Sequence, residues 1–151
     1  LGEFKMSDNL KDLIRKGDRA LREGNTLVAL VQFETAHAIE PLPAIKAKMA
    51  FCLAKERRQY QRAMALCLEA LKMEPDNPDH YYQLSRIHLI AGQKSKAIKA
   101  MRKGLRFKRY QPFIDERVQL GARQSPVFSS FPREHIINRS AGRLLTKIGL
   151  R

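Results

Sequence analysis

The sequence predicts an all-α fold built from repeated pairs of helices, and three observations lead to this. Apolar residues recur three and four residues apart, and no stretch alternates over the length of a strand. Small residues recur with a period of 34 residues, and glycine or proline breaks separate the segments between them. Hydrophobic residues make up 44% of the chain, but Trp is absent and aromatics reach only 7%. The core is therefore expected to consist mainly of Leu, Ile, Ala and Met, a composition that favours helices.

Six helices are predicted along the first two thirds of the chain, and each begins or ends at a recognisable signal. Asn9 is the predicted N-cap of the first helix, and Asn77 caps the fifth, with Pro78 at its first position. Gly24 and Gly92 break the first and third helix pairs, while a short turn at 57–59 breaks the second. The predicted helices cover residues 10–23, 26–39, 44–56, 60–73, 78–91 and 95–107.

The helix pairs form three segments of equal length, which align without gaps. The segments are 10–43, 44–77 and 78–111. Proline closes the first two, and small residues recur at two equivalent positions, which hold Ala29, Ala63 and Ala97, and Ala36, Ala70 and Gly104. Small side chains let neighbouring helices approach closely, and the prolines stop one helix before the next begins.

These residues resemble the tetratricopeptide repeat family over 10–111. The third repeat matches best, at Tyr81, Leu84, Gly92, Ala97 and Gly104. In the second repeat Met49 and Ala50 stand one residue early for the family's usual Leu-Gly pair, which leaves the register of helix 44–56 open by one residue. The resemblance implies a right-handed solenoid of antiparallel helix pairs, and a protein-binding adaptor or scaffold that uses its concave face.

The chain is expected to contain one repeat domain, at 6–121, closed by a cap helix at 112–121. A Pro- and Ser-containing loop should follow at 122–132, and then a terminal basic amphipathic helix at 133–151. That last helix either docks on the domain, fills its groove or binds elsewhere. Residues 1–5 precede Met6 and are interpreted as a remnant of cloning.

The charge balance predicts an acidic partner. Lys and Arg number 29 against 15 acidic residues, for a net charge of +14. Three kinds of partner would explain this excess of positive charge: an acidic peptide or protein, a nucleic acid, or an anionic membrane contacted peripherally. A charged surface that only keeps the protein soluble would explain it as well. A homo-oligomer stacked through its exposed ends also stays open. Cys52 and Cys67 are expected to be reduced thiols, and the absence of a leader or a long apolar run predicts a cytoplasmic protein.

The resemblance assigns peptide-binding residues to the first helix of each pair. The main residues expected to line the groove are Arg22, Lys48, Lys55, Tyr82, Arg86 and Leu89. The residues expected beside them are Lys11, Ile14, Asp18, Leu21, Cys52 and Asp79. Their mixture of cations with apolar and aromatic groups suits an extended or helical peptide that carries acidic residues. The chaperone-tail clamp of the family needs Lys, Asn and Arg, and none of the corresponding residues matches: Ile14, Asp18, Met49, Asp79 and Gln83.

An alternative function rests on a second basic surface. Residues 80–114 contain no acidic residue, and a basic patch is predicted on helix 95–107 at Lys99, Arg102, Lys103 and Arg106. Together with the terminal helix, this patch would dock the protein on nucleic acid or on an anionic membrane. We find no nucleophile motif, phosphate loop or metal-ligand spacing, so no catalytic residue, metal or cofactor is predicted and the protein is not expected to be an enzyme.

Overall fold

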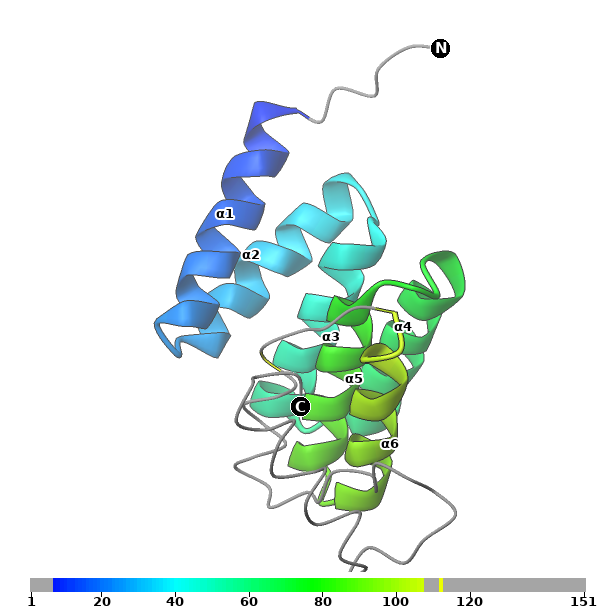
Figure 1. The fold of residues 1–151 in the computed structure, drawn as a ribbon. Helices are drawn as coiled ribbons and strands as arrows, with labels where there is room; N and C mark the ends of the chain where they lie inside the picture. Colours follow the sequence, from blue (N-terminus) through cyan, green and yellow to red (C-terminus); the bar gives the residue numbers. More distant parts are fainter. Residues whose placement is uncertain (1–6, 108–111, 113–151) are drawn as a thin grey trace, which may run out of the picture. The chain divides into compact units, whose positions relative to one another are not determined.

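The computed structural model describes residues 7–107 and Pro112, and this part of the chain is helical with no strand (Figure 1). The predicted all-α fold is confirmed. The helices are α1 (Asp8–Arg22), α2 (Thr26–Ile39), α3 (Pro43–Arg57), α4 (Tyr60–Met73), α5 (Pro78–Ile90) and α6 (Lys94–Gly104). Contacts divide the chain into two units, Leu1–Val118 and Gln119–Arg151, and all six helices belong to the first. Apart from Pro112, the predicted cap helix, loop and terminal helix lie outside the described residues, as does the remnant at 1–5.

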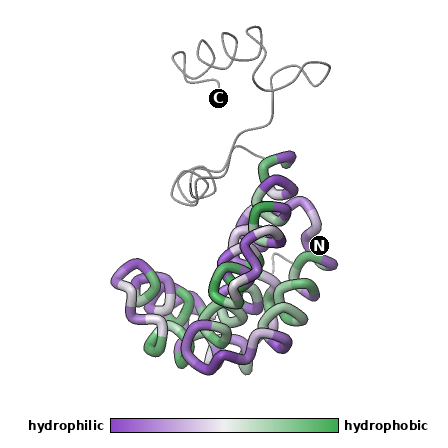
Figure 2. The backbone as a smooth tube through the Cα atoms, turned by 90° about the horizontal axis from the view of Figure 1, so that it is seen from below, coloured by the Kyte–Doolittle hydropathy of each residue, from purple (hydrophilic) through white to green (hydrophobic). Residues whose placement is uncertain are grey.

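The helices pack in consecutive pairs, and the recurring small residues lie where they meet. α1 packs on α2, α3 on α4 and α5 on α6, while α3 also contacts α2 and α5. Ala29, Ala63 and Ala97 are completely buried, and the second set of small residues, at 36, 70 and 104, is buried too. Figure 2 shows hydrophobic and hydrophilic residues interspersed along the helical turns, which lets each helix bury one side and solvate another.

The second repeat follows the same register as the third. Residues 34 positions apart are buried alike, as Ala47 is with Tyr81 and Ala50 with Leu84. The left-handed turn residue Arg58, which lies 34 residues after Gly24 and 34 before Gly92, agrees with the same gapless alignment.

Two predicted helix ends need correction. The N-cap of α1 is Ser7 rather than Asn9, because the Ser7 Oγ accepts a hydrogen bond from the Leu10 amide at 3.3 Å. α6 ends at Gly104 rather than at residue 107, because the amides of Arg106 and Phe107 donate to carbonyls only three residues back. Arg106 thus lies in the turn after the helix. The Asn77 cap is confirmed, since its Oδ1 accepts from the Asp79 amide at 3.0 Å.

The turn inside each helix pair uses a left-handed backbone conformation at an equivalent position. Gly24 has a φ of 77° and Gly92 a φ of 73°. The second repeat has Arg58 there instead, with a φ of 53°, and it is the one non-glycine residue with positive φ in the described part of the chain. Glycine adopts this conformation without strain and arginine does not.

A buried contact between the helices of the first pair joins Gly17 of α1 to Phe33 of α2. A Cβ atom on Gly17 would lie 2.7 Å from the Phe33 Cε1, so only glycine fits beneath this ring. At the equivalent positions of the second repeat the sizes are reversed, with Phe51 on α3 and Cys67 on α4, both buried. At this site the first repeat therefore has the large residue on its second helix, and the second repeat has it on its first helix.

Candidate functional site

The predicted groove residues lie on α1, α3 and α5, and we call this surface the A-helix face. Arg22 and Lys55 are exposed in the last turns of α1 and α3. The remaining four are half-buried: Lys48, Tyr82, Arg86 and Leu89. Cys52 was expected to line the groove but is completely buried, because it points into the core of the helix pairs.

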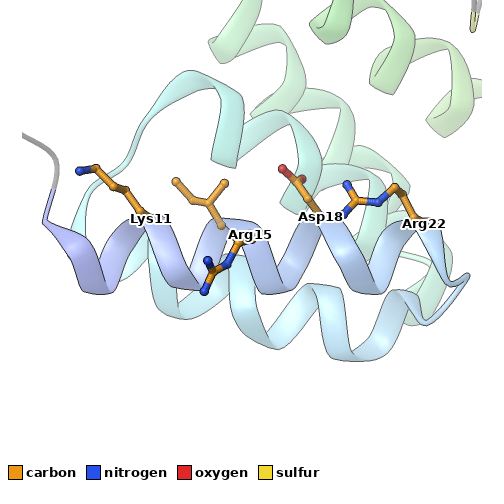
Figure 3. A pocket seen from close by; sticks show the side chains of 5 residues that line it. Lys11, Arg15, Asp18 and Arg22 are labelled. Carbon is orange, nitrogen blue, oxygen red and sulfur yellow. The ribbon is translucent and has the colours of Figure 1, made fainter.

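Part of the A-helix face on α1 is hollowed. An open depression of about 330 Å³ is lined by Lys11, Ile14, Arg15, Asp18 and Arg22. Figure 3 shows Lys11, Asp18 and Arg22 on the same side of α1, whereas Arg15 points to another side. The lining of the depression thus consists of three cations, one carboxylate and one apolar side chain.

Lys48 is neutralised from within the chain. Its Nζ lies 2.6 Å from the Asp18 Oδ1, and this ion pair links α3 to α1. The Lys48 and Asp18 side chains are 26% and 30% exposed, so water screens the pair only in part. The same Nζ lies 5.9 Å from the centroid of the Phe33 ring. Lys48 is therefore a weaker candidate for binding an acidic partner than its sequence position suggests.

Arg86 of α5 is held against aromatic rings instead of a carboxylate. Its guanidinium carbon lies 3.4 Å from the centroid of the Phe51 ring on α3 and 5.3 Å from that of Tyr82. The Arg86 Nη1 also donates to the Gln83 Oε1 at 3.5 Å. Among the described residues, no ion pair to Arg86 is present. We call Phe51, Tyr82, Gln83 and Arg86 the Arg86 seat.

The geometry of the Arg86 seat suits recognition of a carboxylate. A guanidinium stacked on a ring keeps the N–H groups at its edge available, and these match the two oxygens of a carboxylate. The stacking also restricts the side chain before any ligand arrives, which lowers the entropy lost on binding.

Both cysteines are free and buried, and neither is a reactive thiol. Burial raises the pKa of Cys52 to about 12, although the Arg86 guanidinium acts in the opposite direction. Burial likewise raises the pKa of Cys67 to about 12, and the Cys67 Sγ donates a hydrogen bond to the His80 carbonyl at 3.3 Å. Over residues 7–107, no group of three His, Cys, Asp or Glu side chains could hold a metal ion, and no helix is long and apolar enough to cross a membrane.

The predicted basic patch lies at the last described helix. Lys99, Arg102 and Lys103 are exposed on α6, and Arg106 is exposed in the turn that follows. No ion pair joins them to any other described residue. The Lys103 Nζ lies 5.7 Å from the centroid of the Tyr81 ring.

Two aromatic residues near these sites were not among the predicted ones. Phe51 forms the floor of the Arg86 seat, and Phe107 stacks on Tyr81 with ring centroids 5.8 Å apart. A signal for Phe51 does exist in the sequence, since it is a large residue where the first and third repeats have Gly17 and Ser85.

Comparisons with known proteins agree with the helical arrangement. The tetratricopeptide repeat family profile matches residues 66–99. DnaJ homolog subfamily C member 3 of Mus musculus is 27% identical over 100 residues, which cover 63% of this chain and 20% of that protein. The chain thus spans about a fifth of the length of this curated relative.

The solved structures to which the chain is similar include the following two. The crystal structure of the P58(IPK) TPR domain matches with a TM-score of 0.56 at 20% identity, covering 76% of this chain and 35% of that one. A MamA RS-1 ArsTM double mutant matches with a TM-score of 0.40 at 18% identity, covering 95% and 94% of the two chains.

Proposed function

Since this chain belongs to the tetratricopeptide repeat family, whose domains generally mediate protein–protein interactions, we propose that it is a non-catalytic adaptor or scaffold. Its ligand is a peptide or protein segment with acidic residues, and the segment binds along the A-helix face. The two free thiols fit a reducing compartment, and we assign the protein to the cytoplasm on that basis.

The Arg86 seat is the observation that carries this proposal. It offers a half-buried cation that no described carboxylate neutralises, on the face that the family resemblance assigns to ligands. Leu89 lies one turn further along α5 and is half-buried, so an apolar side chain next to the acidic one has a surface to contact. The exposed cations Arg22 and Lys55 supply further charge on the same face.

Selection from a random peptide library, followed by binding measurements with the full chain, tests the proposal. We expect the selected peptides to be rich in Asp and Glu. Arg86→Ala should weaken their binding about tenfold or more, because a hydrogen-bonded contact to a charged group contributes about 1.5–3 kcal/mol. Arg86→Lys should restore part of the loss, since lysine keeps the charge but has no planar fork.

Arg62→Ala provides the control, because Arg62 is an exposed cation on α4 and lies outside the A-helix face. If Arg62→Ala and Arg86→Ala weaken peptide binding equally, the weakening comes from the change in overall charge and not from the Arg86 seat. Peptides that bind Arg86→Ala as tightly as the wild type would exclude the Arg86 seat as the binding site.

A further inference from the structure

Six positions on the second helix of each pair and the turn after it stay exposed in every repeat. The last of them holds Ile39, Met73 and Phe107, and we call the other five the outer ridge. On α2 they hold Leu27, Val28, Val31, Thr35 and Ala38. On α4 they hold Gln61, Arg62, Ala65, Glu69 and Lys72. On α6 and in the turn after it they hold Ser95, Lys96, Lys99, Lys103 and Arg106.

The outer ridge lies away from the side on which the following helix packs. α3 packs on α2 and α5 packs on α4, and the five positions remain exposed on both helices. Arg102 belongs to a different side, because its equivalent Glu34 forms an ion pair with Arg57 of α3, at 2.8 Å. The ridge therefore includes Lys96 and omits Arg102, and it differs in these two residues from the predicted basic patch.

The ridge of α6 differs from the other two in its charge. It carries four cations and no acid, and no described carboxylate is paired with any of them. Successive cations such as Lys99 and Lys103 are one helical turn apart, or about 6 Å along the axis, and the whole ridge extends about 15 Å. The buried residues of α6 lie on the opposite side of the helix: Ala97, Ala100, Met101 and Gly104.

An aromatic ring stands at the end of this ridge. Phe107 follows Arg106, is 48% exposed, and stacks on Tyr81 with an angle of 17° between the rings. The equivalent residues Ile39 and Met73 are 48% and 60% exposed although a further helix pair follows each of them. One side of the Phe107 ring is thus supported by Tyr81, and the residue keeps a large exposed area.

We propose that the α6 ridge binds single-stranded nucleic acid, with its cations along the phosphodiester backbone and a base stacked on Phe107. A row of cations beside an aromatic platform is how proteins hold single strands without reading their sequence. A bilayer fits less well, because the ridge positions on α6 hold only polar or charged residues, which leaves Phe107 as the one apolar side chain at the ridge that could insert. The unbroken row of cations is also confined to one helix, since the α4 ridge carries Ala65 and Glu69 between Arg62 and Lys72, where α6 has Lys99 and Lys103.

Fluorescence anisotropy of the full chain with labelled oligo(dT) and oligo(U) of about 20 nucleotides tests this proposal. Four phosphate contacts predict that the logarithm of the binding constant falls against the logarithm of salt concentration with a slope of about −3. Lys99→Glu combined with Lys103→Glu should reduce that slope by about half and weaken binding at least about tenfold. Phe107→Ala should weaken binding about fivefold or more, through the lost stacking of one base.

The control is Arg62→Glu combined with Lys72→Glu, which makes the same change in net charge on the equivalent ridge of α4. This variant should bind both oligonucleotides within about twofold of the wild type. Equal weakening by the two charge reversals, or no weakening by the α6 variant, would overturn the proposal. So would binding to phosphatidylglycerol vesicles in the absence of oligonucleotide binding, which would assign the ridge to a membrane surface instead.

Discussion

The two junctions between repeats use their equivalent positions on the A-helix face in different ways. Between the first and second repeats, Asp18 and Lys48 neutralise one another at 2.6 Å. Between the second and third repeats the equivalent residues are Cys52 and Tyr82, a thiol and a phenol in place of the carboxylate and the ammonium group. The cation of this second junction is Arg86, and it lies over the Phe51 ring. The first junction therefore satisfies its charge internally, while the second holds a positioned charge that no described carboxylate neutralises.

The ring beneath Arg86 exists because of the way the second repeat fills its interior. The first repeat has a small residue on its first helix and a large one on its second, Gly17 and Phe33. The second repeat reverses this order, with Phe51 and Cys67. Placing the large side chain on α3 brings it within reach of α5, so a change in core packing creates a feature of the proposed binding surface.

The largest expected effect comes from exchanging the two arrangements in the first repeat. Phe33→Cys should destabilise the protein by about 3 kcal/mol through the cavity it leaves. Gly17→Phe should cost about 3 kcal/mol or more, because the Phe33 ring already occupies the space. The double variant reproduces the order of the second repeat, and it should lose about 1–3 kcal/mol less than the sum of the single losses. Urea unfolding followed by circular dichroism measures all three.

A double variant whose loss equals that sum would show that the two positions do not share one space. The milder Gly17→Ala serves as a further check on the contact. It gains about 1 kcal/mol of helix propensity but forces a Cβ against a completely buried ring, so its net effect should still be destabilising.

A smaller effect is expected from making the first junction resemble the second. Asp18→Asn leaves Lys48 half-buried without its partner and should lower the free energy of unfolding by about 1 kcal/mol. The same change releases Lys48 for a ligand, so an acidic peptide selected on the wild type should bind about threefold more tightly. Unfolding and anisotropy measurements on one preparation report both effects.

Glu34→Gln is the matched control for that experiment. This change breaks the ion pair between Arg57 of α3 and Glu34 of α2. The pair crosses the same junction, but Glu34 does not lie on the A-helix face. Its effect on peptide affinity should be negligible, and an increase equal to that of Asp18→Asn would point to net charge instead.

The smallest expected effect is a loss of stability at acidic pH, caused by Glu74 at the second junction. The hydrogen bond from Asn77 and the contact with His80 lower the pKa of Glu74 from its usual 4.5. Its stabilising contribution is therefore present above pH 4.5 and is lost as the pH falls through the lower pKa of the folded state. The side chain is 43% exposed, so solvent screening limits this to a few tenths of a kcal/mol, ~0.5 at most. Glu74→Gln should flatten the dependence of stability on pH in this range, and a curve unchanged from the wild type would contradict the assignment.

Local patterns predicted most of the fold. Spacing, breaks and caps predicted all six helices in the described part of the chain, most of them to within two residues at each end. The exceptions have local physical causes. Ser7 outcompetes Asn9 as a cap because its hydroxyl reaches the Leu10 amide, and α6 stops early because its last turn tightens after Gly104. Differences of one hydrogen bond at a helix end are too small to appear in a sequence pattern.

The candidate site was less predictable, because its features depend on contacts between distant residues. Tyr82 and Arg86 are one turn apart on α5, so their common face followed from helical spacing. The Phe51 ring lies on another helix, and only the packing of α3 on α5 brings it to Arg86. The neutralisation of Lys48 by Asp18 likewise joins residues 30 positions apart.

Arg58 makes the middle repeat the natural place to strengthen this scaffold. Its left-handed backbone carries a conformational penalty of about 1 kcal/mol that Gly24 and Gly92 avoid at the matching turns. The substitution Arg58→Gly would place glycine at the equivalent position of all three turns and remove most of that penalty. The arginine is exposed, so such a change offers a thermostable parent for library work without touching either proposed binding surface.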